Sequence, residues 1–96
     1  MLVLISYDVS TEDNAGRKRL RRIAKLCQDH GQRVQFSVFE CELTPAQWTA
    51  LRHSLLNEMN DTQDSLRFYF LGARGREKIE HHGGRTPLDL EGPLIL

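Results

Sequence analysis

The sequence predicts an α+β sandwich, in which a sheet of strands packs against helices within one small domain. Three apolar runs, at residues 2–8, 34–43 and 65–71, are rich in β-branched and aromatic residues, as strands are. Between them, two segments that start near residues 15 and 45 carry apolar residues at helical spacing. A chain of 96 residues fits a single domain, and we assign residues 1–96 to it.

The first predicted strand and helix occupy the first third of the chain. Leu2–Asp8 is almost continuously apolar before its last residue, which is typical of a strand buried on both faces. Residues 10–14 are polar and able to cap a helix, and Gly31 is a natural C-terminal cap. We expect the helix over Ala15–His30 because one stripe of it is apolar, namely Leu20, Ile23, Ala24 and Cys27.

A second strand and a second helix are predicted next. The strand covers Val34–Leu43 and has apolar side chains on both of its faces. Thr44, Pro45 and Gln47 then have the pattern of a helix start, with an N-cap, a proline at the first helical position and a capping box. The inner face of this helix is expected to consist of Trp48, Leu51 and Leu55.

The remaining elements complete the predicted fold. They are a loop, a strand, a short further strand and an apolar tail strand, at 60–64, Ser65–Leu71, Glu77–His82 and Pro93–Leu96. We assign residues 1–72 to the core, and residues 73–96 to the short strand and a tail for dimer or partner contact. The predicted order is that of a ferredoxin-like βαββαβ sandwich, with an extra short C-terminal strand.

The apolar residues of the strands predict that two copies of the chain associate. Both crossover connections should be right-handed, which puts the two helices on the same face of the sheet. Yet the strands are apolar on both faces, as these opposed residues show: Leu2 and Leu4 against Val3 and Ile5, Phe36 against Phe39, and Phe68 against Tyr69. Because large exposed apolar patches are rare on monomers, we expect a homodimer joined through its sheet faces.

The composition excludes several classes of protein. No run approaches the roughly 20 apolar residues of a membrane span. The apolar start lacks the basic segment of a signal peptide, so we expect a cytoplasmic protein without membrane contact. Cys27 and Cys41 are too few for a disulfide scaffold or a zinc site, and we expect reduced, buried thiols. The formal net charge is zero, so the chain as a whole is not a polycation.

Positive charge is nevertheless concentrated in one helix. Six of the 13 lysines and arginines lie at residues 17–25, whereas the acids are dispersed. This clustering predicts a surface for phosphate groups, and a solvated helix face is the alternative. Arg33, Arg74 and Arg76 would lengthen the basic track. Since the basic helix has no aromatic residue, we expect contact with a nucleic-acid backbone rather than stacking of bases.

Asp8 is the candidate catalytic and metal-binding residue. Strand alternation puts it on one face with Ser6 and puts Tyr7 on the other. A turn-forming or helix-capping acid is the alternative role at this position. One carboxylate is a poor magnesium site, but a two-fold axis would bring two copies of Asp8 together. We therefore expect Mg²⁺ between the two Asp8 side chains of a dimer, where it would polarise a phosphodiester.

Three segments of the sequence resemble a known family. Tyr7-Asp8-Val9-Ser10, the basic helix, and the run Gly31-Gln32-Arg33-Val34-Gln35-Phe36-Ser37-Val38-Phe39-Glu40 are similar to the CRISPR-associated protein 2 family. The resemblance implies a homodimer that acts in the acquisition of CRISPR spacers and partners the integrase, CRISPR-associated protein 1. It also implies a Mg²⁺-dependent endonuclease that cleaves single-stranded RNA or double-stranded DNA.

The same resemblance implies roles for particular residues. Asp8 would be the magnesium ligand and catalytic acid, with Tyr7 beside it in the catalytic site, and Ser10 and Phe39 would support them. The helix arginines do not align uniquely, because the turn at residues 10–16 varies in length within the family. From this resemblance and from the clustering of charge on the helix, we predict that nucleic acid binds to Arg17, Arg19, Arg21, Arg22 and Arg33.

Three functions remain open on the sequence alone. The first is a metal-dependent phosphodiesterase that acts through paired Asp8 side chains. The second is a non-catalytic adaptor that binds duplex DNA along its arginines and docks an integrase through its C-terminal tail. The third, a ligand-binding regulatory module, has no supporting pocket motif, and a ferredoxin-like fold alone implies no function.

Overall fold

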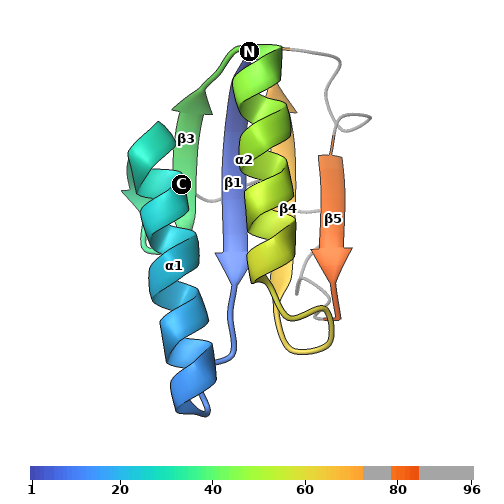
Figure 1. Ribbon diagram of the computed structural model, residues 1–96. Coiled ribbons are helices and arrows are strands. Elements are labelled where there is room, and N and C mark those ends of the chain that lie inside the picture. The colour runs from blue at the N-terminus through green and yellow to red at the C-terminus, as the bar shows by residue number, and fades with distance from the viewer. Residues whose placement is uncertain (73–78, 85–96) are drawn as a thin grey trace.

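The computed structural model describes residues 1–72 and 79–84, which form a five-stranded antiparallel sheet and two helices (Figure 1). The elements in chain order are β1 (Leu2–Asp8), α1 (Asn14–His30), β2 (Gln32–Gln35), β3 (Val38–Glu42), α2 (Pro45–Glu58), β4 (Ser65–Leu71) and β5 (Ile79–Gly83). Across the sheet the order is β2-β3-β1-β4-β5. This confirms the predicted ferredoxin-like βαββαβ sandwich with an extra short C-terminal strand.

One predicted element is wrong in its bounds. The stretch Val34–Leu43 is a hairpin of β2 and β3 joined by a turn at Phe36 and Ser37, rather than one strand. The apolar pattern runs through the turn, so hydrophobicity does not reveal it. The turn is held by β1, because the backbone N–H of Tyr7 donates to the carbonyl of Ser37 at 3.0 Å. The break also supplies the strand that the βαββαβ order requires.

Both helices begin at side chains that satisfy their first backbone N–H groups. Asp13 caps α1 by accepting from the N–H of Gly16 at 2.8 Å, within the polar stretch expected to do so. Gly16 is needed there because a Cβ would lie 1.9 Å from the carbonyl oxygen of Ser10. At α2, Thr44 and Gln47 form the predicted capping box. These caps set where each helix leaves the sheet.

The main core lies between the helices and the sheet. The three inner strands β1, β3 and β4 contribute one face of their side chains, and the helices contribute the apolar stripes that were predicted. The ring of Trp48 packs edge-to-face on Phe68, with centroids 4.8 Å apart. Buried members include Val3, Ile5, Ile23, Phe39, Trp48, Leu51, Leu55, Leu66 and Phe68.

The junction between α1 and β2 is tightly packed around two thiols. Gly31 ends α1, and a Cβ on it would lie 2.4 Å from the Sγ of Cys41. Cys27 and Cys41 are free cysteines, and both are buried as predicted. Burial raises the pKa of Cys27 to about 12 and that of Cys41 to about 11, so both thiols stay protonated at neutral pH.

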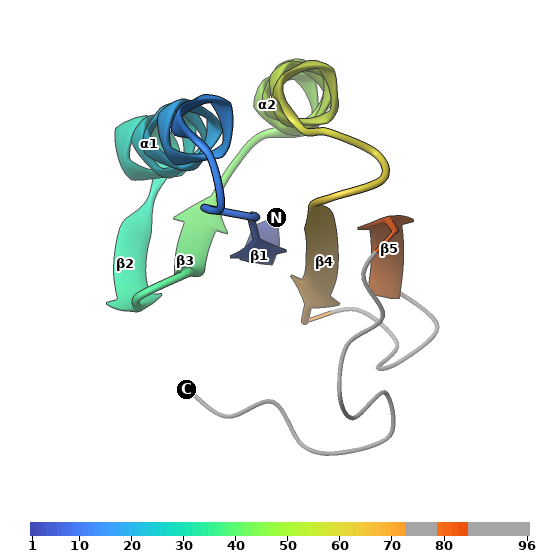
Figure 2. The ribbon, with the colours of Figure 1, turned by 90° about the horizontal axis from the view of Figure 1, so that it is seen from below.

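The second face of the sheet carries no helix among the described residues (Figure 2). Strand pairing puts Leu4 of β1 beside Glu40 of β3 and Tyr69 of β4 on this bare face. The predicted apolar character of both faces therefore holds for β1 and β4, whereas β3 presents Val38 together with the acids Glu40 and Glu42 there. Phe36 does not oppose Phe39 across the sheet as predicted, since it lies in the turn and is 93% exposed.

Part of the predicted C-terminal region lies within the structure. The short strand expected at Glu77–His82 is observed as β5, Ile79–Gly83. Residues 77 and 78, Arg74 and Arg76, and the tail strand Pro93–Leu96 lie outside the described residues. Among the helices that the structure describes, none is long and apolar enough to cross a membrane.

Candidate functional site

Asp8 lies where β1 ends, exposed on the bare face of the sheet. Its partner across the β1–β4 ladder is Ser65, the first residue of β4. It borders a pocket of about 290 Å³ that this end of the sheet shares with the β2–β3 turn. The pocket is lined by Ser6, Tyr7, Asp8, Ser37, Ser65, Arg67 and Tyr69. The pocket thus combines one carboxylate and three serine hydroxyls with a guanidinium.

These groups fit a hard cation. Carboxylate and hydroxyl oxygens suit Mg²⁺, which keeps several of its waters and needs only one or two protein carboxylates. The described residues hold no cluster of three or more His, Cys, Asp or Glu, so they offer no zinc-type or calcium-type cage. His81 and His82 lie opposite Arg67 and Leu66 and so face different sides of the sheet. Asp8 is the residue of this pocket that would hold Mg²⁺.

Tyr7 lies on the other face of β1 and is buried. Its phenol O–H donates to the carbonyl of Phe36 at 3.3 Å, and its ring stacks on Phe39 with centroids 6.2 Å apart. Burial raises the pKa of Tyr7, and a hydrogen bond with Arg33 offsets only part of this effect. The phenol therefore stays protonated at neutral pH. Tyr7 holds the turn that brings Ser37 to the Asp8 pocket.

Phe39 and Arg33 continue this aromatic cluster to the sheet edge. The ring of Phe39 is fully buried, and the Cζ of Arg33 lies 5.0 Å from its centroid. A guanidinium at this distance is attracted by the face of the ring. Arg33 is exposed on β2, at the edge of the sheet. The structure thus brings Tyr7, Arg33 and Phe39 together on the side of the sheet opposite Asp8.

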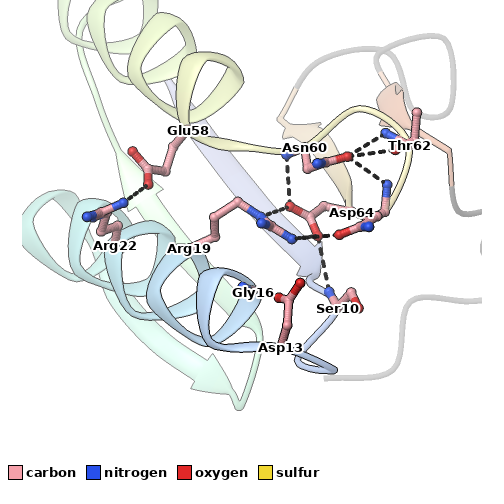
Figure 3. Close-up of polar contacts among 10 residues, drawn as sticks. Ser10, Asp13, Gly16, Arg19, Arg22, Glu58, Asn60, Thr62 and Asp64 are labelled. Carbon is pink, nitrogen blue, oxygen red and sulfur yellow. Dashed lines mark hydrogen bonds and ion pairs between the residues drawn. The ribbon is translucent and has the colours of Figure 1, made fainter.

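Arg19 and Ser10 meet at a buried carboxylate that the sequence did not indicate. The Nε of Arg19 donates to the Oδ2 of Asp64 at 2.8 Å, and the backbone N–H of Ser10 donates to its Oδ1 at 3.1 Å (Figure 3). The N–H of Asn60 donates to the same carboxylate at 2.9 Å. Asp64 is fully buried, so this network ties α1 and the β1–α1 loop to the start of β4.

The ionisation of Asp64 is maintained by these donors. Burial pushes the pKa of Asp64 upward, but the hydrogen bonds from Arg19, Asn60 and Ser10 outweigh it and leave the pKa below its ordinary value. The Arg19 side chain is only 14% exposed. Its guanidinium is therefore committed to Asp64, and Ser10 contributes a backbone donor rather than its hydroxyl.

The other cations of α1 divide into two groups. Arg17 is bonded within its own turn, to the carbonyl of Thr11 and the side chain of Asn14. The second group consists of Lys18, Arg21, Arg22 and Lys25. Together with Leu26 and Glu58, these cations line a groove of about 560 Å³ between the helices, which we call the basic groove.

Two cations of the basic groove have acidic partners. Arg22 pairs with Glu58 at 3.2 Å, as Figure 3 shows, and Lys25 pairs with Asp29 at 2.7 Å. Lys18 and Arg21 have no ion-pair partner within residues 1–72 and 79–84. The groove therefore keeps an excess of positive charge, which suits a phosphate backbone.

Sequence reasoning missed three residues that line the Asp8 pocket. Ser37 and Ser65 are small polar residues whose place depends on the turn and on strand pairing. Arg67 did leave a signal, because it is the one charged residue in the strand Ser65–Leu71, between two core residues. Strand alternation alone would have assigned it to the face away from Leu66 and Phe68.

Fold and site together define a class of protein. The molecule is a ferredoxin-like α+β domain with a polar pocket around Asp8 on its bare sheet face and a basic groove between its helices. Residues 1–79 match the family described as CRISPR associated protein Cas2. The chain belongs to this family.

Relatives and solved structures agree with this assignment. The chain is 66% identical over 96 residues to the CRISPR-associated endoribonuclease Cas2 of Chlorobaculum tepidum, covering 100% of both chains. It is 52% identical over 95 residues to the CRISPR-associated endonuclease Cas2 of Halalkalibacterium halodurans, covering 99% of each. The crystal structure of Streptococcus pyogenes Cas2 superposes with a TM-score of 0.70 at 54% identity, over 83% of this chain and 96% of that one.

Proposed function

We propose that this chain is a nucleic-acid-binding homodimer of CRISPR spacer acquisition that hydrolyses phosphodiester bonds with Mg²⁺ at Asp8. The observation that carries this proposal is the exposed Asp8 carboxylate in a pocket of hydroxyls and a guanidinium on the bare sheet face. Two relatives support the proposal by their names. The Chlorobaculum tepidum protein is named an endoribonuclease, and the Halalkalibacterium halodurans protein is named an endonuclease. Single-stranded RNA and double-stranded DNA are therefore both candidate substrates.

The chain's own residues have distinct parts in this chemistry. Asp8 would hold Mg²⁺, which when bound polarises a phosphodiester and lowers the pKa of a bound water. A second carboxylate would come from Asp8 of the second copy, which completes the one or two carboxylates that Mg²⁺ commonly uses. The hydroxyls of Ser6, Ser37 and Ser65 are hydrogen-bond donors for phosphate oxygens on the same wall of the pocket.

The bare face supports the homodimer. Leu2, Tyr69 and Leu71 lie together on it by strand register, and none of the three is fully buried. Pressing two such faces together across a two-fold axis would cover these apolar side chains. Because Asp8 lies on the same face, the same contact would bring the two carboxylates toward each other.

The basic groove supplies the sequence-independent binding surface in this proposal. Lys18 and Arg21 are available for phosphate contacts, and such contacts hold a duplex or a single strand without reading its bases. The integrase, CRISPR-associated protein 1, is the proposed protein partner. Its proposed docking element is the C-terminal tail, which lies outside the described residues.

A nuclease assay with matched variants tests the proposal. Purified wild type, Asp8→Ala and Asp61→Ala are compared on single-stranded RNA and duplex DNA, with Mg²⁺ and with EDTA. Asp61 is an exposed acid in the loop before β4 and serves as the control. We expect the cleavage rate of Asp8→Ala to fall by about 100-fold or more, while oligonucleotide affinity is unchanged. Cleavage by Asp8→Ala at the wild-type rate would refute the catalytic role.

A second candidate function is a non-catalytic adaptor of the integrase complex. It is favoured by the composition of the pocket, which contains one carboxylate and no histidine to act as a general base. The adaptor function predicts that Asp8→Ala cells acquire spacers at the wild-type rate, whereas loss of the groove cations abolishes acquisition. Measuring spacer acquisition in cells with each variant separates the two functions.

A further inference from the structure

Arg67 occupies an unusual position for a charged residue. It lies within β4, between Leu66 and Phe68, which are both fully buried in the core. Strand alternation therefore sends its side chain to the bare face, where its register partner in β1 is Ser6. The next pair on this face in the same ladder is Asp8 with Ser65. The guanidinium and the Asp8 carboxylate thus border the same pocket.

The guanidinium of Arg67 is held in place but is not fully bonded. Its Nε is buried and has no hydrogen-bond partner among the described residues. Its Cζ lies 5.5 Å from the ring centroid of Tyr69, which is also on the pocket wall. A buried N–H on a cation is costly to leave without an acceptor. The described residues therefore leave part of the hydrogen-bonding capacity of this guanidinium unused.

We propose that Arg67 is a phosphate-binding residue of the Asp8 pocket, which it supplies with the positive charge that a phosphodiester anion requires. This inference rests on the proposed function of the pocket. Asp8 by itself would repel a phosphodiester, whereas a planar guanidinium presents parallel N–H donors that match two phosphate oxygens. The arrangement assigns the anion to Arg67 and the serine hydroxyls, and leaves Asp8 for the cation.

The same contact would assist hydrolysis. In this reaction the oxygen of water bonds to phosphorus, the bond from phosphorus to one sugar oxygen breaks, and a proton from the water ends on that leaving oxygen. Negative charge builds on the two non-bridging oxygens on the way. Donors already aimed at those oxygens stabilise the transition state more than the substrate. Arg67 would therefore influence the rate as well as the affinity.

A binding measurement without metal tests the phosphate site itself. Diuridine monophosphate, too short to extend to the basic groove, is added in EDTA while the ¹⁵N resonances of the arginine Nε–H groups are recorded. We expect the Arg67 signal to shift on saturation and the Arg52 signal, which belongs to a guanidinium bound to Glu80 at 2.9 Å, to stay in place. An Arg67 signal that does not move at saturating dinucleotide would overturn the proposal.

Cleavage kinetics test the effect on rate. Arg67→Ala and Arg67→Gln are expected to lower kcat by about 100-fold, and Arg67→Lys to recover part of it, because lysine keeps the charge but loses the planar fork. Arg52→Ala, which removes a cation from the helical side, should cleave at close to the wild-type rate. Because three different substitutions are made at Arg67, the test still gives a result if one of these variants does not fold.

Light scattering on the same samples checks a competing role. If Arg67→Gln and Arg67→Lys turn a dimeric protein into monomers while their dinucleotide affinity stays at the wild-type value, Arg67 serves a subunit contact and the proposal is wrong. If the wild type cleaves nothing but its Arg67 signal still shifts with dinucleotide, the phosphate site stands and only the nuclease function fails.

Discussion

Arg19 and Asp64 form an ion pair across 45 residues of sequence, with 2.8 Å between the Arg19 Nε and the Asp64 Oδ2. The carboxylate is fully buried and also accepts backbone N–H groups from Ser10 and Asn60. The pair therefore fixes α1 to the β1–α1 loop at Ser10, two residues after Asp8. It anchors the basic helix with one of its own arginines, so that other cations of α1 line the groove between the helices.

Loss of this pair should destabilise the fold. Arg19→Ala leaves the Asp64 carboxylate buried without its cation, and we expect the free energy of unfolding to drop by about 3–5 kcal/mol. Arg17→Ala removes an exposed arginine from the same helix and should change it by less than about 0.5 kcal/mol. Urea unfolding followed by circular dichroism measures both. Equal stability of the two variants would show that the pair contributes nothing.

Acid should weaken the protein through the same carboxylate. The folded-state pKa of Asp64 lies below its ordinary value of 3.8. A group with a depressed folded pKa contributes stability above its unfolded pKa and loses it as the pH falls through the folded pKa. We therefore expect stability to decline below about pH 4, and Asp64→Asn to show a shallower decline there. Urea midpoints across this range test it, and parallel pH profiles for the two proteins would contradict it.

A second carboxylate sets how much acid sensitivity the Asp64→Asn variant retains. The pKa of Glu80 is also lowered, because hydrogen bonds from Arg52 and His82 outweigh the upward push of burial. Its contribution to stability is likewise lost on acidification. The Asp64→Asn protein should therefore still weaken in acid, and Asp64→Asn combined with Glu80→Gln should have the flattest profile of the set.

The basic groove should govern the salt dependence of nucleic-acid binding. Lys18→Ala and Arg21→Ala are each expected to reduce the slope of log affinity against log salt by about 0.7–0.9, the value for one lost phosphate contact. Arg52→Ala, whose guanidinium is bound to Glu80, should leave the slope unchanged. Fluorescence anisotropy with duplex DNA at several salt concentrations provides the slopes. A reduction in the Arg52 variant as large as in the others would argue against a specific groove.

The bare face of the sheet should hold two copies together. Leu71 is 39% exposed on this face, and Leu71→Glu would place a charge in the proposed contact. We expect this variant to be monomeric in sedimentation equilibrium at a concentration where the wild type is a dimer. Ala50→Glu adds the same charge to an exposed position of α2 and should remain dimeric. A wild type that sediments as a monomer of 11.1 kDa would exclude the homodimer itself.

Several elements could be predicted because their signals are local. The capping box of Thr44 and Gln47, the apolar stripe of α1 and the runs that became β1 and β4 depend on residues close in sequence. The same local alternation placed Asp8 and Tyr7 on opposite faces of β1. The turn at Phe36 and Ser37 escaped prediction, because an apolar pattern with period two continues unbroken through it.

The candidate site depended on pairing between distant segments. The sequence by itself determined the α+β class, an acid at the end of the first strand and a cationic helix. Only the tertiary structure decided that Arg19 is committed to Asp64, and that Ser37, Ser65 and Arg67 share a pocket with Asp8. Caps and periodicity arise from interactions within a turn or two of chain. Strand register and buried ion pairs instead depend on how the whole core packs, which no local pattern encodes.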